Sequence, residues 1–137
     1  MTFETFDHTA DLGLRVRAAD LNSLFADAAR GLFSIIATGL DPARAADMVR
    51  FQLAASAIDL LLFDWLNELL YTYESRRLLL SRFDVQVADN WLSGVAYGEP
   101  VDAGRHSLEH EVKAITYHGL KVERVDEGWL AEIIVDI

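Results

Sequence analysis

Two aspartates and the carboxyl terminus carry carboxylate groups that could bind a hard divalent cation. Asp11 opens a segment in which apolar and polar residues alternate, Asp136 lies at the end of another, and Ile137 follows it with the terminal carboxylate. Carboxylate oxygens, completed by water, are ligands that Ca²⁺, Mg²⁺ and Mn²⁺ all accept. If the two segments are antiparallel neighbours in a sheet, the two acids meet. Spacing alone does not establish that pairing, and two ordinary acids at a solvated edge are the simpler interpretation.

Histidines can bind zinc, but the residues around the four histidines of this chain do not favour a zinc site. His106 and His110 stand one helical turn apart, a spacing that suits zinc on a helix, but Gly104 and other loop residues argue against a helix there. His8 and His118 each fall at a strand boundary, where a hydrogen bond to local backbone is the simpler role. Because the sequence has no Gly-x-Ser-x-Gly turn and no glycine-rich phosphate-binding loop, serine hydrolysis and self-contained nucleotide chemistry are unsupported.

Length and composition favour a single domain over residues 1–137. Hydrophobic residues make up 52% of the chain, enough for a packed core at this length, and the absence of cysteine excludes disulfides and thiolate metal sites. The 22 acidic and 12 basic residues give a formal net charge of −10. A surface of this sign repels phosphate backbones, so we expect no direct nucleic-acid binding. A cation or a basic protein partner is easier to accommodate.

The sequence also predicts a cytoplasmic protein without membrane contact. Its first residues lack the basic and apolar regions of a signal peptide. The longest apolar run, residues 60–63, is far shorter than the roughly 20 residues that a membrane span requires.

Apolar residues at the helical period predict two helices. The first begins after Asp20, whose carboxylate is suited to cap the first turn, and ends near Gly39. The second is predicted to begin at Ser56, with Asp59 three residues later in a pattern that resembles a capping box. Its apolar stripe over residues 62–73 indicates tight packing against a sheet.

The polar side of the second helix contains Asp64 and Glu68, one turn apart. We interpret these two acids as part of a solvated surface.

The remaining segments predict strands that are mostly antiparallel. Strands are expected over residues 11–18, 48–54, 78–88, 91–97 and 129–136, with two shorter ones within 111–125 separated near His118. Gly94 inside a strand suggests a bulge, and residues 98–109 resemble a loop. The predicted fold is therefore α+β: a compact single domain in which two α-helices pack on one face of a mostly antiparallel β-sheet.

Five motifs, which follow one another in order over nearly the whole chain, resemble those of the archease family. They are Asp7-His8-Thr9-Ala10-Asp11, Trp65-Leu66-Asn67-Glu68-Leu69-Leu70, Gly98-Glu99-Pro100 with Asp102 and His106, the run from Glu111 to His118, and the final Asp136-Ile137. Each motif alone is weak, and their order makes the resemblance specific.

The resemblance implies a non-enzymatic activator of the RtcB-type RNA ligase, which acts in tRNA splicing and RNA repair. It implies that the chain promotes guanylylation of the ligase by GTP, a nucleotide that the ligase itself uses, and so supports multiple turnover. It also implies a compact sheet with two helices. The family's metal-binding acids match Asp11, Asp136 and the terminal carboxylate of Ile137, where a divalent cation (Ca²⁺, Mg²⁺ or Mn²⁺) is expected, with Gly13 leaving room beside it.

Further candidates for supporting the site or contacting a partner lie in the same motifs. They are His8, Asp102, His106, Glu111, Lys113 and His118.

Two other functions stay open at this point. A general chaperone or protein-interaction module without a dedicated ligase client would protect unrelated proteins from aggregation without any metal. A metal-dependent hydrolase would use Asp11 and Asp136 to activate water, although the sequence offers no convincing general base beside them.

Overall fold

The alternating segment that begins at Asp11 forms strand β2 (Asp11–Ala18), and its alternation separates a buried face from an outer face. Leu14 and Val16 on one face are fully buried, whereas Arg15 lies on the other. The structure is a computed structural model that describes residues 2–8 and 11–137. Strand β2 pairs antiparallel with β9 (Gly128–Asp136), so the two segments that carry the predicted acids are neighbours.

The other strands extend this pair and build a second sheet, with antiparallel pairing throughout the described residues. The first sheet has the order β1-β2-β9-β8, with β1 (Thr2–His8) and β8 (Ala114–Val125) at its edges. The second has the order β4-β6-β5, from β4 (Asp47–Ala54), β6 (Trp91–Pro100) and β5 (Leu78–Ala88). A short pair joins β3 (Ala37–Thr38) to β7 (Ser107–Leu108), and a 3-10 turn η1 covers Pro42–Arg44.

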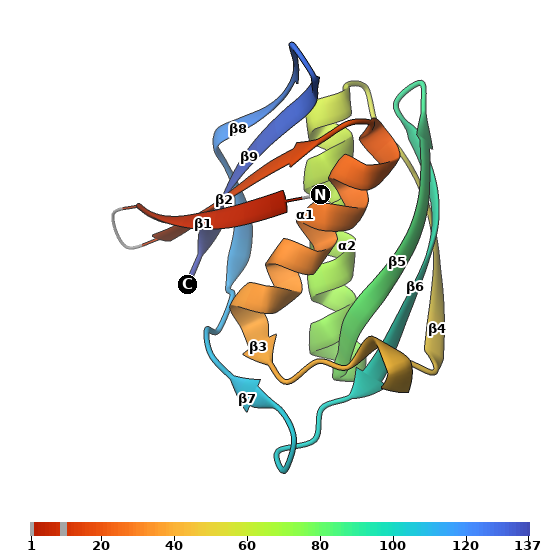
Figure 1. The fold of residues 1–137 in the computed structure, drawn as a ribbon, viewed down its shortest axis with the longest axis vertical. Coiled ribbons are helices and arrows are strands. Elements are labelled where there is room, and N and C mark those ends of the chain that lie inside the picture. Colours follow the sequence, from red (N-terminus) through yellow and green to blue (C-terminus); the bar gives the residue numbers. More distant parts are fainter. Residues whose placement is uncertain (1, 9–10) are drawn as a thin grey trace.

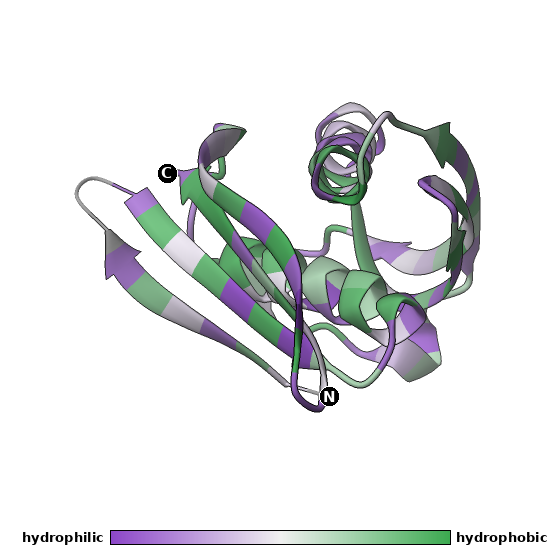
Figure 2. Ribbon diagram, turned by 90° about the horizontal axis from the view of Figure 1, so that it is seen from above, coloured by the Kyte–Doolittle hydropathy of each residue, from purple (hydrophilic) through white to green (hydrophobic). Residues whose placement is uncertain are grey.

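Both helices lie between the two larger sheets (Figure 1, Figure 2). Helix α1 (Leu21–Ile36) packs on β2 and β5, which belong to different sheets, and α2 (Ile58–Arg76) packs on β8 and β5. The predicted α+β class is confirmed, but the helices do not cover one face of a single sheet. Helix α1 is buried around most of its circumference, and such a helix needs packing partners on both sides. No helix in the described part of the chain is long and apolar enough to cross a bilayer.

Trp65 of α2 occupies the centre of this layered core and is fully buried. Its indole packs edge-on against Phe51 and Phe83 of the second sheet, with ring centroids 5.1 and 6.3 Å away. The indole Nε1 donates a hydrogen bond to the backbone carbonyl of Phe25 in α1 at 3.0 Å. Trp65 therefore connects both helices to the β4-β6-β5 sheet.

The two helices begin differently. Asp20 caps α1 as predicted, because its Oδ1 accepts a hydrogen bond from the Ser23 amide at 2.8 Å, and this bond lowers the pKa of Asp20. The predicted cap of α2 is wrong: Ala57 is the capping residue and has no side-chain hydrogen bond to offer. Asp59 Oδ1 instead accepts from the adjacent Leu60 amide at 2.8 Å, so the acid serves the first turn without Ser56.

Three strand features differ from the prediction. Strand β6 continues past Gly94 in unbroken register, so the predicted bulge there is wrong, and the irregularity lies in β5 between Leu80 and Arg82. Residues 98–100 belong to β6 and not to a loop, since the strand continues to pair with β5 as far as Pro100. The predicted pair of strands within 111–125 is one strand, β8, whose pairing is interrupted between Thr116 and Lys121, close to the predicted break.

Strand β1 has no counterpart in the prediction. Its two phenylalanines, Phe3 and Phe6, lie three residues apart and therefore face opposite sides of the strand. The apolar and polar residues do not alternate regularly there, and the pattern that revealed β2 is absent.

Asp27 is a carboxylate buried within α1. Its side chain is 3% exposed, and Oδ1 lies 2.5 Å from Arg30 Nη1, while Oδ2 has no partner among the described residues. Burial raises the pKa of Asp27, and the nearby Arg30 only partly opposes this effect. The charged carboxylate is therefore less favourable in the folded chain than in the unfolded chain.

Replacing Asp27 by asparagine is expected to give a protein that is more stable than the wild type at neutral pH. The raised folded-state pKa contributes stability that is fully present below the unfolded-state pKa and is lost as the pH rises through the folded-state pKa. Because asparagine does not titrate, the stability difference between variant and wild type should grow over that window and then level off. Urea unfolding at a series of pH values measures it, and a difference that does not depend on pH would contradict the expectation.

Candidate functional site

Asp11 and Asp136 face each other directly across β2 and β9, and both are half-buried. Directly opposed residues of an antiparallel pair point to the same face of the sheet, with Cβ atoms about 4.5–5.5 Å apart. Asp11 shares its face with Arg15, so the two acids lie on the outer face, which the helices do not cover. The register therefore brings the two predicted side-chain acids together.

We call Asp11 and Asp136, together with the positions opposite them in the neighbouring strands, the acid row. His8 at the end of β1 is opposite Asp11, and Ala114 at the start of β8 is opposite Asp136. The Lys113 amide donates a hydrogen bond to the Asp136 carbonyl at 2.8 Å, which fixes the main chain beside the acid. The side chain of His8 and residues 9 and 10 of the first motif lie outside the described part of the chain.

The donors present in the acid row fit a hard cation. Two carboxylates come from adjacent strands, and Ile137, whose terminal carboxylate is the third predicted donor, follows directly after β9. Among the side chains that the structure describes, those of residues 2–7 and 11–137, no three His, Asp or Glu side chains converge on one point. A cation held by Asp11 and Asp136 would therefore also need the terminal carboxylate and water, a donor set that is all oxygen.

Gly13, next to the acid row, has a different role from the one expected. Phe6 of β1 is opposite Gly13, and its ring lies directly over the glycine: a Cβ at Gly13 would come within 2.1 Å of the ring atom Cζ. Gly13 accommodates the Phe6 ring and does not leave room for a cation. The guanidinium of Arg15 lies 4.7 Å from the ring centroid, which adds a cation–π contact.

A row of alternating charges crosses the same face, formed by Glu4, Arg15, Glu132 and Lys121 on four adjacent strands. Arg15 Nε lies 2.5 Å from Glu132, Arg15 Nη1 lies 3.1 Å from Glu4, and Lys121 Nζ lies 3.8 Å from Glu132. The hydrogen bonds with Glu132 and then Glu4 raise the pKa of Arg15. The charges of this row compensate one another, so we assign it to the sheet and not to a binding site.

Asp102 and His106 form a separate cluster in the loop after β6. The His106 side chain is fully buried: Nδ1 accepts a hydrogen bond from the Asp102 amide at 2.9 Å, and Nε2 lies 3.1 Å from Glu99 Oε1. Arg105 also pairs with Glu99, and the Asp41 amide donates to Glu99 Oε2 at 3.2 Å. His106 therefore stabilises the loop from the protein interior. Of Asp102 and His106, only Asp102 is exposed and accessible to a partner.

Glu99 is the residue of this cluster that sequence reasoning missed. It is only 3% exposed, although Gly98 and Pro100 on either side of it favour an exposed loop. The available signal was the pair Arg105 and His106 shortly afterwards, since a buried carboxylate needs cationic or hydrogen-bonding partners.

The last three predicted residues are exposed and follow one another towards and along β8. Glu111 and Lys113 lie in the segment before that strand, where Lys113 touches the acid row through its backbone. His118 lies in the irregular part of β8, and its amide donates to Thr116 Oγ1 at 3.3 Å.

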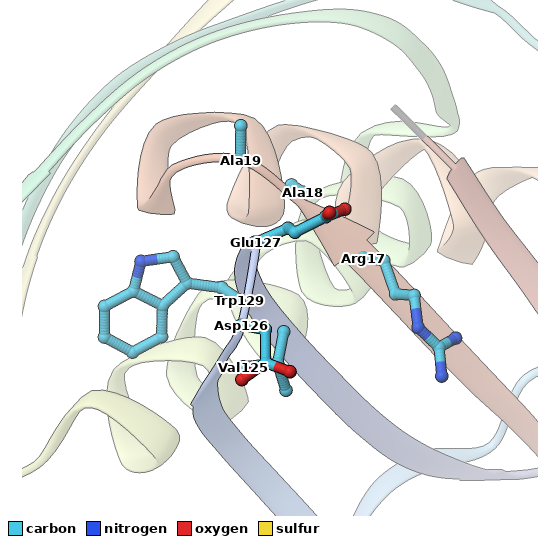
Figure 3. Close-up of a pocket in the computed structure, with 7 residues that line it drawn as sticks. All are labelled: Arg17, Ala18, Ala19, Val125, Asp126, Glu127 and Trp129. Carbon is cyan, nitrogen blue, oxygen red and sulfur yellow. The ribbon is translucent and has the colours of Figure 1, made fainter.

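A pocket of about 580 Å³ lies at the other end of the same sheet (Figure 3). It is lined by Arg17, Ala18, Ala19, Val125, Asp126, Glu127 and Trp129. Ala18 is opposite Trp129, whereas Asp11 is opposite Asp136, so the pocket and the acid row are at opposite ends of β2. None of the predicted site residues lines it.

Comparison with known proteins shows that nearly the whole chain matches one family. The model of the Archease protein family matches residues 3–137. "Protein archease" of Methanopyrus kandleri is 40% identical to this chain over 141 aligned residues that cover both proteins in full. "Protein archease" of Pyrococcus furiosus is 34% identical, with 98% of each protein covered.

Solved structures agree with this result. The solution structure of Methanobacterium thermoautotrophicum protein 1598 is 31% identical to this chain and superposes with a TM-score of 0.81 over 98% of each chain. A crystal structure from Thermotoga maritima, described as an archease and possible chaperone, is 19% identical with a TM-score of 0.62, over all of this chain and 98% of that one. The second similarity supports the fold alone.

Proposed function

Because this chain belongs to the archease family, we propose that it is a non-enzymatic activator of an RtcB-type RNA ligase in tRNA splicing and RNA repair. In this proposal it promotes guanylylation of the ligase by GTP and so supports multiple turnover. The observation that carries the proposal is the acid row, in which two strands far apart in sequence place Asp11 and Asp136 directly opposite each other.

The acid row would hold a divalent cation through Asp11, Asp136 and the terminal carboxylate of Ile137. A cation bound there would supply positive charge that neutralises phosphate oxygens, the need that arises in guanylyl transfer. The chain's own contribution is positioning: the β2–β9 pairing fixes the two acids, and the Lys113 amide holds the carbonyl of Asp136 at 2.8 Å. The net charge of −10 favours encounter with the basic surface expected around an RNA-binding active site.

A general chaperone is the second candidate, because the Thermotoga maritima structure is described as a possible chaperone. The two functions differ in client range. A general chaperone suppresses aggregation of unrelated proteins without a metal, whereas the activator needs its acids and acts on one ligase.

A multiple-turnover RNA ligation assay tests the proposal. With limiting cognate ligase, GTP and Mn²⁺, addition of this protein is expected to raise the number of product molecules formed per ligase molecule well above one. Ligase alone is the control, and single-turnover ligation by pre-guanylylated ligase shows that the enzyme is active. An active ligase whose turnover does not respond to the protein would contradict the proposal.

A further inference from the structure

One side of helix α2 is exposed and is not explained by the acid row. The helix buries Leu62, Trp65 and Leu69 between the two sheets, and the side seen at its outer margin in Figure 2 is turned away from both. We call this side the α2 outer face. It consists of the half-buried Phe63, Asp64 and Asn67 and the exposed Glu68, Tyr71 and Glu74 of the helix, with Tyr117 of β8 stacked against it.

The acids of the α2 outer face are not paired with basic side chains in the part of the chain that the structure describes. Among the described residues, none of Asp64, Glu68 and Glu74 makes an ion pair, and α2 contains no basic residue before Arg76. Asp64 and Glu68 are one turn apart, where like charges destabilise a helix. Glu74 lies in the last turns, where the helix dipole also disfavours an acid. These residues lower the stability of the helix, and a cationic partner would remove that cost.

Exposed aromatic rings lie among these acids. Tyr71 and Tyr117 are 65% and 62% exposed. Tyr117 stacks on Phe63 with ring centroids 4.0 Å apart and 18° between the planes, which holds the tyrosine ring flat against the helix. Large exposed aromatic side chains are typical of protein interfaces.

The combination of flat rings and carboxylates matches the chemistry of a guanidinium group. An arginine side chain stacks on an aromatic face and donates paired hydrogen bonds to a carboxylate. Lys121, the lysine of β8, is already engaged with Glu123 and Glu132 on the outer face of the sheet, at 3.7 and 3.8 Å. The acids repel phosphate groups, which argues against RNA as the occupant.

We propose that the α2 outer face docks a basic, arginine-bearing surface of a partner protein. This inference rests on the proposed function in one respect, that the chain acts by binding a partner. It assigns the contact to α2 and β8, whereas the proposed cation lies between β2 and β9.

Binding to the cognate RtcB-type ligase, measured by calorimetry, tests the assignment. The double variant Asp64→Asn/Glu68→Gln keeps side-chain size and removes two charges, so its affinity for the ligase is expected to fall at least about tenfold, as for the loss of charge-assisted hydrogen bonds. The matched control is Asp84→Asn/Asp89→Asn, which makes the same charge change on the β4-β6-β5 sheet and should alter the affinity less than about twofold. The melting temperature of the α2 variant should not fall, because the change removes like-charge repulsion.

A titration without the ligase separates this inference from the proposed function. Octa-arginine, followed by NMR, is expected to shift the amide signals of Asn67, Tyr71 and Tyr117, and the α2 variant should lose these shifts while the control keeps them. Shifts spread evenly over all acidic residues, or equal weakening in the two variants, would overturn the assignment. If the ligase binds wild type and α2 variant equally, the ligase function stands and the α2 assignment fails. If the ligase does not bind at all, the ligase function fails and the peptide titration decides the assignment.

Discussion

Asp136→Asn is expected to abolish the stimulation of ligase turnover while leaving the fold intact. Asp136 supplies one of two side-chain carboxylates in the acid row and is half-buried on the outer face of the sheet, so its replacement removes a proposed ligand and not a core residue. The affinity for Ca²⁺ or Mn²⁺ should fall at least about tenfold, since even changes to groups that only orient metal ligands cost 10–100-fold.

The same variant should change stability in opposite directions with and without cation. Two like charges placed directly opposite in a sheet are destabilising, so without metal Asp136→Asn should be more stable than wild type by about 0.2–1 kcal/mol. Excess cation should then stabilise the wild type by mass action and have little effect on the variant.

Thermal unfolding with and without Mn²⁺, together with calorimetry, measures both effects. Asp126→Asn, which changes an exposed acid in the β8–β9 hairpin, is the matched control and should behave like the wild type. Cation binding and ligase stimulation that survive in Asp136→Asn would show that the acid row is not the metal site.

Trp65→Ala is expected to cause the largest loss of stability, about 3–5 kcal/mol of the free energy of unfolding. The substitution removes a fully buried indole that packs on Phe51 and Phe83, and it also removes the hydrogen bond to the Phe25 carbonyl. Because Trp65 contacts both helices and one sheet, the surrounding groups cannot all move to fill the cavity.

Urea unfolding followed by circular dichroism measures this loss. Trp91→Ala makes the same chemical change at a position that is 44% exposed, and it should cost less than about 1 kcal/mol. Trp65→Phe retains most of the apolar contact and should fall between the two. Equal losses for Trp65→Ala and Trp91→Ala would contradict the central role of Trp65.

Local sequence patterns predicted most of the individual elements. The alternation after Asp11, the helical period after Asp20 and the strands over residues 78–88 and 91–97 all correspond to structure. Asp89 and Asn90, which connect those two strands, both have the positive φ that a tight hairpin requires. These features depend on neighbouring residues alone. Alternation failed for β1 because Phe3 and Phe6 face opposite sides of that strand.

The arrangement of the elements could not be predicted in the same way. Periodicity shows that a face is buried but not what covers it, so the placement of both helices between two sheets was not visible. Buried acids were missed for a related reason: Asp27 and Glu99 are polar residues that sequence patterns assign to the surface, whereas here a half-buried Arg30 pairs with Asp27 and a buried His106 lies beside Glu99.

The candidate site was predictable only in part. The acids Asp11 and Asp136 could be named, but their meeting depended on a strand pairing that the sequence did not establish. Asp102 and His106 were named as candidates. The sequence did not show that His106 is buried against Glu99, because that contact forms only in the folded loop.

The position of β9 between β2 and β8 also sets the order in which this protein can fold during synthesis. The pairing joins residue 11 to residue 136, so the four-stranded sheet cannot close until nearly all of these residues have left the ribosome. The β4-β6-β5 sheet and α2 lie within residues 47–100 and can associate earlier. The acid row is thus completed in the same late step that covers the second half of the core. A nascent chain that has not yet folded completely therefore has no acid row, and this half of its core is still uncovered.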